Sequence, residues 1–336
     1  MRPEHRVINF MELGLGTSVD QPCAAPMVAP LASNRVCTTQ LSIGGLCLRI
    51  TSSNPSDVLL NAELQIFPGG MDAADVEIDV HWLSEIPPAP EQIGFDSGTT
   101  WRFYDRGDHL QFDFGDPITR GPVYKRLLID RGFRRAKLWM ARNYFDQLSC
   151  SPDPLGYPLD ELLITHRLTQ ERGIELHGVG MVGPNGANNL FIGHSGAGKS
   201  TTARLWTSLH QVKILSDDRI IVRESPARDL QLGDDPRQIF MYGTPWHGEA
   251  CFALPDRAPL HRIFILEHGH GNVITRLSKS QAVGELFARA FVPFHRHQYI
   301  ESALSFLEQV AESVPCYRYS FEPDARAVEK ILHFHD

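Results

Sequence analysis

The residues best suited to chemistry form a glycine-rich loop at Gly193–Ser200. Its sequence, GHSGAGKS, fits the pattern G-x-x-x-x-G-K-[ST], in which backbone N–H groups surround a phosphate. Glycines permit the backbone conformations and the close approach that this requires. The helix expected after the loop adds its positive end. The nucleotide-binding residues predicted here are Gly193, His194, Ser195, Gly196, Ala197, Gly198, Lys199, Ser200 and Thr201.

Two side chains at the end of this loop suit a nucleotide and its metal ion. Lys199 would reach the outer phosphates as a point charge, and the Ser200 hydroxyl would help to hold Mg²⁺. An apolar run at Leu190–Ile192 precedes the loop, and Ala203 and Trp206 follow it at helical spacing. The sequence therefore predicts ATP and Mg²⁺ as cofactors. A glycine-rich turn without this function is the alternative.

Adjacent carboxylates follow a second apolar run. Val212–Leu215 is predicted to be a short buried strand, and Asp217 and Asp218 lie just beyond it. Carboxylates near a phosphate loop hold magnesium or accept the proton of an attacking hydroxyl. Because successive side chains of an extended backbone point to opposite sides, these two would divide the roles. A β-turn or a helix cap is the alternative.

A β-hairpin is predicted to lead into the loop. Its strands are Ile174–Val182 and Leu190–Ile192, and the residues between them, Pro184–Asn189, are typical of a turn. This arrangement brings His177, on the first strand, within reach of a bound nucleotide. A histidine packed in the strand for structural reasons is the alternative.

These residues, in this order, resemble the catalytic domain of HPr kinase/phosphorylase and its kinase-like relatives, and more distantly ATP-type phosphoenolpyruvate carboxykinase. The resemblance covers about Glu161–Ile265 and points to the uncharacterised kinase-like branch. It implies that Asp217 is the general base and that His177 lies beside the transferred phosphate. The implied catalytic residues are Asp217, Lys199 and His177, and the implied metal ligands are Ser200 and Asp218.

The activity implied by the resemblance is transfer of the γ-phosphoryl group of ATP to a hydroxyl, such as a serine of a protein or peptide. Thr201-Thr202 follow the loop where the family usually has an acidic residue, so the acceptor stays unidentified. Two other functions fit the same residues. One is an ATP-binding regulatory or assembly protein with slow hydrolysis, and the other is a kinase for a small molecule.

The pattern of the whole chain predicts an α+β or α/β protein, with a small, mainly antiparallel N-terminal β module and a phosphate-loop domain of the HPr kinase/phosphoenolpyruvate carboxykinase type. The expected boundaries are a loose arm at 1–34, the β module at 35–120, a basic helical connector at 121–158, and the kinase-like domain with its C-terminal helices at 159–336. The role of the β module is left open.

Several elements are predicted from periodicity. Strands are expected at Val36–Leu41, Leu46–Thr51, Leu59–Phe67, Val76–Trp82 and Arg262–Glu267, and a hairpin at Trp101–Phe114. Helices are expected at Leu159–Glu171, Ser278–Phe291, His297–Val314 and Pro323–His335. The loop Gly243–Glu249, which holds Trp246 and His247, is either a wall of the active site or a structural turn.

Composition limits the classes of function. The 336 residues include 32 Lys and Arg against 40 Asp and Glu, for a net charge of −8, which argues against a nucleic-acid partner. Hydrophobic residues at 42% are ordinary for a globular protein. No apolar run is long enough for a membrane span, and no secretory signal is evident, so a cytoplasmic location is expected. The six scattered cysteines suggest neither zinc nor disulfides, and a homo-oligomer is left open.

Overall fold

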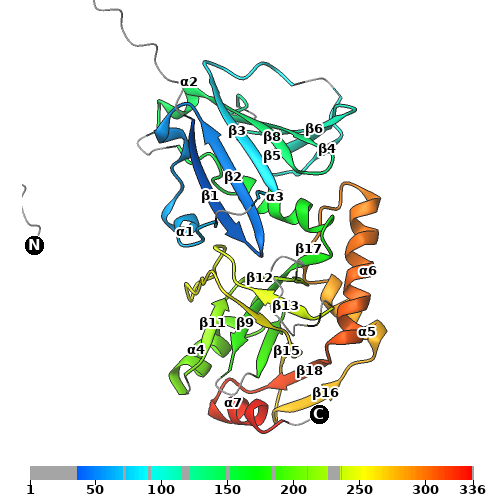
Figure 1. Ribbon diagram of the computed structural model, residues 1–336. Helices are drawn as coiled ribbons and strands as arrows, with labels where there is room; N and C mark the ends of the chain where they lie inside the picture. Colours follow the sequence, from blue (N-terminus) through cyan, green and yellow to red (C-terminus); the bar gives the residue numbers. More distant parts are fainter. Residues whose placement is uncertain are drawn as a thin grey trace, which may run out of the picture. The chain divides into compact units, whose positions relative to one another are not determined.

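The structure is a computed structural model of the chain. It describes residues 36–70, 73–89, 92–115, 121–148, 152–183, 187–209, 211–225, 235 and 237–334. The predicted N-terminal arm, 1–34, lies outside these residues. Val36–Asp336 forms one compact unit, and within it the chain builds two mixed β-sheets with helices, so the prediction of a mixed α and β protein is confirmed (Figure 1).

The first sheet contains eight strands among the described residues. They are β1 (Cys37–Ile43), β2 (Leu46–Ser52), β3 (Val76–Leu83), β4 (Phe95–Asp96), β5 (Trp101–Asp105), β6 (His109–Phe114), β7 (Lys125–Asp130) and β8 (Arg135–Ala141). Their order is β1-β2-β3-β8-β7-β6-β5-β4. The β2–β3 and β3–β8 pairs are parallel, and the other neighbours are antiparallel. The predicted hairpin is confirmed as β5 and β6.

The helical connector predicted between residues 121 and 158 is wrong for most of its length. Strands β7 and β8 form there and join the first sheet, followed by one short helix, α2 (Arg142–Phe145). Leu127 and Leu138 are fully buried, whereas Arg135 is exposed. Buried and more exposed residues alternate along β7 and most of β8 with the period of two that a strand requires. The exposed basic residues Arg135 and Lys137 of β8 thus belong to one face of a strand and not to a helix.

The strand predicted at Leu59–Phe67 is also wrong. The segment forms a 3₁₀ turn, η1 (Pro55–Val58), followed by the short helix α1 (Ala62–Gln65). The side chain of Asn61 caps this helix by accepting a hydrogen bond from the Leu64 N–H. A capping asparagine followed by the helix formers Ala62–Gln65 therefore begins a helix here and not a strand.

The second sheet has ten strands in the part of the chain that is described. They are β9 (Gly173–Val182), β10 (Asn188–Ile192), β11 (Lys213–Ser216), β12 (Arg219–Glu224), β13 (Ile239–Tyr242), β14 (Arg257–Pro259), β15 (Arg262–His268), β16 (Val273–Arg276), β17 (Ala290–Phe291) and β18 (Cys316–Phe321). The order is β14-β13-β12-β9-β10-β15-β18-β16, and β11 and β17 also pair with β9. The predicted hairpin is confirmed as the antiparallel pair β9 and β10.

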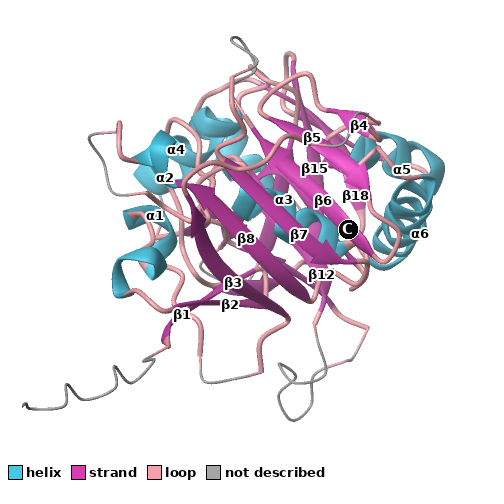
Figure 2. Cartoon of the chain, turned by 90° about the horizontal axis from the view of Figure 1, so that it is seen from above, coloured by secondary structure: helices cyan, strands magenta, loops and turns pink. Residues whose placement is uncertain are grey.

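Helices cover both faces of the β10–β15–β18 region (Figures 1 and 2). In β10, Leu190 and Ile192 pack in the cluster that contains α5 (Lys279–Phe287) and α6 (His297–Ser313). Phe191, which points the other way, packs with α4 (Lys199–Leu209) and α7 (Ala325–Leu332). Because side chains alternate along β10, one face of the sheet is covered by α5 and α6 and the other by α4 and α7. The loop after β10 leads into α4.

The remaining helix, α3 (Leu159–Leu168), packs against the first sheet. Its residues Leu159 and Leu163 share a cluster with Leu127 of β7 and with Ile221 of β12. The core of the first sheet therefore reaches the second sheet through α3 and β12. No helix among the described residues is both long and apolar enough to cross a membrane.

Candidate active site

The glycine-rich loop connects β10 to α4, as the sequence predicts. Gly198 has a φ of +97°, a conformation that residues with a side chain rarely adopt. A Cβ atom there would lie 2.6 Å from Cζ of Phe321, and one at Gly193 would lie 2.7 Å from Cβ of Ala197. The loop can therefore keep its path only with glycine at these positions. His194 to Gly196 are exposed at its tip.

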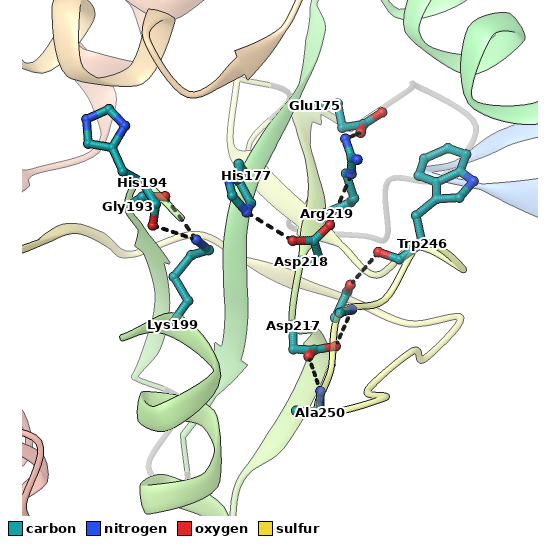
Figure 3. Close-up of polar contacts among 12 residues, drawn as sticks. Glu175, His177, Gly193, His194, Lys199, Asp217, Asp218, Arg219, Trp246 and Ala250 are labelled. Carbon is teal, nitrogen blue, oxygen red and sulfur yellow. Dashed lines mark hydrogen bonds and ion pairs between the residues drawn. The ribbon is translucent and has the colours of Figure 1, made fainter. Parts of the chain in front are cut away.

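Lys199 folds back over the loop. Its Nζ donates hydrogen bonds of 3.0 Å to the carbonyl oxygens of Gly193 and His194, and the residue is only 7% exposed (Figure 3). Burial lowers the pKa of Lys199, while the carboxylate of Asp218 opposes that shift. The ammonium group thus lies close enough to Asp218 for the two to affect each other.

A histidine and a carboxylate meet beside Lys199. The register of β9 with β12 sets His177 opposite Arg219, next to Asp218. His177 Nε2 lies 3.0 Å from Oδ1 of Asp218, and the backbone N–H of Gly178 donates to the Asp218 carbonyl oxygen over 2.9 Å. The hydrogen bond from His177 is the main cause that lowers the pKa of Asp218. Both side chains keep about a quarter of their surface exposed.

Asp217 does not join this group. It is 1% exposed, and its carboxylate accepts hydrogen bonds from the N–H groups of Gly248, Ala250 and Phe252 at 3.0, 2.8 and 3.1 Å. Its backbone neighbour Asp218 points toward His177 (Figure 3). The two aspartates do diverge, but these contacts make Asp217 an anchor for the following loop and argue against its predicted role as the general base.

The loop Gly243–Glu249 is held by structural contacts. The Trp246 Nε1–H donates to Oδ2 of Asp160 over 2.7 Å, and the Thr244 hydroxyl donates to the Arg219 carbonyl oxygen over 2.7 Å. Asp217 holds the same loop from another side. Of the two interpretations offered by the sequence, the anchored turn therefore accounts for the contacts of Trp246.

Arg219 is the residue that sequence reasoning missed. Its guanidinium lies 3.2 Å from Asp218, 2.9 Å from Glu161 and 3.5 Å from Glu175. It also lies 3.8 Å from the centre of the Phe291 ring. Glu175 is completely buried, and burial, aided by the charge of Glu161, raises its pKa well above the ordinary value. The only signal in the sequence was the position of Arg219 directly after the two aspartates.

The structure brings together three of the predicted site residues: Lys199, His177 and Asp218. Ser200 and Thr201 lie in the first turn of α4, where the backbone N–H groups of any α-helix lack intrahelical partners. Within the described ranges, no three His, Cys, Asp or Glu side chains are grouped so that they could hold a metal ion by themselves.

No family model matches the chain, and no curated protein is significantly similar to it. The resemblance to HPr kinase/phosphorylase therefore stays a prediction, and its support comes from the arrangement of Lys199, His177 and Asp218 at the glycine-rich loop.

Proposed function

We propose that the protein is an ATP-dependent phosphotransferase that moves the γ-phosphoryl group to a hydroxyl of a protein or peptide. One observation carries this proposal. Lys199, His177 and Asp218 converge at the glycine-rich loop, and Lys199 and Asp218 each shift the pKa of the other. A loop that only turns the chain would need neither a buried lysine nor a nearby histidine and carboxylate.

The residues of the loop fit a nucleotide with magnesium. Gly193 and Gly198 let the loop follow its tight path against Ala197 and Phe321, and the first turn of α4 offers N–H groups with a favourable dipole. Lys199 would exchange the two carbonyl oxygens it now contacts for phosphate oxygens. The Ser200 hydroxyl would take part in holding Mg²⁺, which proteins often bind through few of their own groups plus phosphates.

Asp218 is the proton acceptor in this proposal. Its contact with His177 lowers its pKa, which keeps it ionised at neutral pH. The attacking hydroxyl would give its proton to the Asp218 carboxylate while its oxygen bonds to the γ-phosphorus and the bond to the β-phosphate oxygen breaks. ATP would supply the phosphoryl group, and Mg²⁺ would neutralise its charge. His177 and Arg219 would hold Asp218 in place during this step.

Transfer of labelled phosphate tests the proposal. The purified protein would be incubated with γ-labelled ATP, Mg²⁺ and an extract of the cells that produce it. We expect label on a discrete protein or peptide, with phosphoserine found by mass spectrometry. Label on a soluble metabolite would indicate a small-molecule kinase. Nucleotide-dependent association with no labelled acceptor would contradict the proposal and favour an ATP-dependent regulatory protein.

Matched variants tie any activity to the site. We expect Asp218→Asn to lower transfer by about 10²- to 10⁴-fold, the usual contribution of a general base, while it still binds ATP with magnesium. The control is Asp146→Asn, which changes an exposed aspartate that follows α2 and should leave transfer unchanged. If Asp218→Asn instead abolished the magnesium dependence of ATP binding, Asp218 would be a metal ligand and not the base.

A further inference from the structure

A cavity of about 440 Å³ lies next to the candidate active site. Three separate parts of the chain form its walls: the start of β5 in the first sheet, helix α3, and residues 290–294. Trp101, Leu162, Phe291 and Phe294 give it a largely apolar and aromatic lining. We call it the aromatic pocket. Its volume is in the range of pockets that enclose small molecules or large side chains.

The aromatic pocket begins close to the proposed proton acceptor. The ring of Phe291, one of its walls, lies 3.8 Å from the Arg219 guanidinium, and Arg219 Nε lies 3.2 Å from Asp218. The centre of the same ring is 6.2 Å from that of His177. An extended peptide rises about 3.3 Å per residue, so about two residues would span from Asp218 to this wall.

The mouth of the aromatic pocket is unusually apolar for a protein surface. Tyr157 and Phe294, which both line it, are 66% and 57% exposed. Exposed apolar groups around an apolar cavity mark a site that binds another molecule. These side chains extend the apolar surface beyond the cavity. Such a surface suits a peptide, which would place one side chain in the cavity and continue across the rim, better than a small molecule that the cavity encloses entirely.

One charged side chain, Glu161, lines the aromatic pocket, and it is already paired with Arg219 at 2.9 Å. No lysine or arginine is among the described residues that line the pocket, so it offers little attraction to an acidic group. Its other polar walls include Thr99, Thr100 and Thr165, whose hydroxyls are neutral. These features favour an uncharged, bulky side chain as the occupant.

We propose that the aromatic pocket binds an aromatic side chain of the peptide acceptor, placed one or two residues from the serine that receives the phosphoryl group. This inference rests on the proposed function. It gives the first sheet a role in recognising the acceptor, since Trp101 belongs to β5. Burial of the aromatic ring in the pocket would make the protein prefer peptides that carry an aromatic residue at this position. The serine hydroxyl of the same peptide would then lie at Asp218.

Binding of short peptides tests the proposal without any phosphate transfer. The probes are acetylated pentapeptide amides that contain one serine and, one or two residues to either side, phenylalanine or alanine. Binding would be measured by calorimetry in the absence of ATP. We expect at least one phenylalanine peptide to bind about tenfold more tightly than its alanine partner, as burial of part of a ring predicts. Equal binding of all pairs would overturn the proposal.

Two variants show whether the preference arises in the aromatic pocket. Thr165→Trp places a large ring in the cavity and should abolish the preference for phenylalanine. The control Thr275→Trp, on the exposed surface of β16, should retain it. Phe294→Ala, at the exposed rim, leaves the core intact and should reduce the preference about threefold. If the preference survives both changes at the pocket, the peptide binds elsewhere and the proposal is wrong.

A last comparison separates a peptide from a free aromatic compound. If N-acetylphenylalaninamide bound as tightly as the best peptide, the pocket would take small aromatic compounds and the peptide assignment would be wrong. These results are independent of the proposed function, because no transfer is measured. Label transfer without a phenylalanine preference would overturn only the role of the pocket. A phenylalanine preference without any transfer would overturn the kinase, and with it the role of the bound peptide as acceptor, and would leave only peptide binding at the pocket.

Discussion

At the scale of single residues, the adjacent Asp217 and Asp218 differ in burial and in contacts, although they form a pair in the sequence. Asp217 is buried and satisfied by three backbone N–H groups. Asp218 is partly exposed and faces His177. Period-two alternation predicted that they would diverge. Which of them faces the site depends on the loop at 248–252, whose path the sequence does not reveal.

This difference predicts unequal losses of stability from two matched substitutions. Asp217→Asn should destabilise the fold by about 2–4 kcal/mol, because the amide NH₂ would face backbone donors that now meet a carboxylate. Asp218→Asn should cost less than about 1 kcal/mol, as expected for a partly exposed ion pair. Urea unfolding of both variants and the wild type measures this. A larger loss of stability in Asp218→Asn would contradict the assignment of anchor and base.

At the scale of elements, the sequence predicted the parts nearest the loop best. The hairpin β9 and β10, helix α4 and the start of helix α5 after its cap Ser278 are all present. Their signals are local, since they depend on turns, caps and periodicity within a few residues. Strand β18 was missed, and β7 was predicted as a helix. Strand β18 pairs with β15 and β16, from which α5 and α6 separate it in the sequence, so a single-segment pattern does not show its partners. Strand β7 pairs with its sequence neighbours β6 and β8, and the alternate burial of its residues has the period of a strand.

The glycine-rich loop gives the sharpest prediction at this scale. Gly198→Ala should destabilise the loop by about 1–3 kcal/mol and weaken nucleotide binding, because its φ is positive and the Cβ would lie 2.6 Å from Phe321. Gly284→Ala in helix α5 is the control. No atom lies within 4 Å of its new Cβ, so alanine should stabilise that helix by about 0.5–1 kcal/mol.

Thermal unfolding and nucleotide titration of both glycine variants check this contrast. Equal effects of the two substitutions would show that the loop tolerates a side chain at Gly198. The tight path inferred for the loop would then be wrong.

At the scale of the whole compact unit, Asp160 joins α3 to the loop that Asp217 anchors, through its bond with Trp246. Burial, the main cause, raises the pKa of Asp160 to about 7 from 3.8. The folded state therefore keeps a proton that the unfolded state loses, so stability falls as the pH rises from about 4 to about 7. The shift corresponds to at most about 4 kcal/mol.

Asp160→Asn should remove this pH dependence. The amide oxygen can still accept the Trp246 hydrogen bond, and the side chain cannot ionise. Relative to the wild type, the variant should gain up to about 4 kcal/mol between pH 4.5 and pH 7.5, measured by urea unfolding. His166 and His295, whose pKa values are lowered to about 3 and about 4, act in the opposite direction, but they are common to both proteins.

The control for this experiment is again Asp146→Asn, which should follow the wild type at both pH values. If the free energy of unfolding of Asp160→Asn changed with pH as it does in the wild type, Asp160 would ionise without cost in the folded protein. The burial of the Asp160 carboxyl could not be predicted from the sequence, because it arises from the packing of α3 between the two sheets.

The proposed function depends on nucleotide binding at Lys199, which titration calorimetry with ATP and Mg²⁺ tests directly. The wild type should bind with a dissociation constant between about 1 μM and 1 mM, the usual range for enzyme substrates. Lys199→Met, which keeps the side-chain length but removes the charge, should bind at least about 100-fold more weakly. Lys330→Ala, at an exposed lysine of α7, should match the wild type. No saturable binding to the wild type, or undiminished binding to Lys199→Met, would contradict the account.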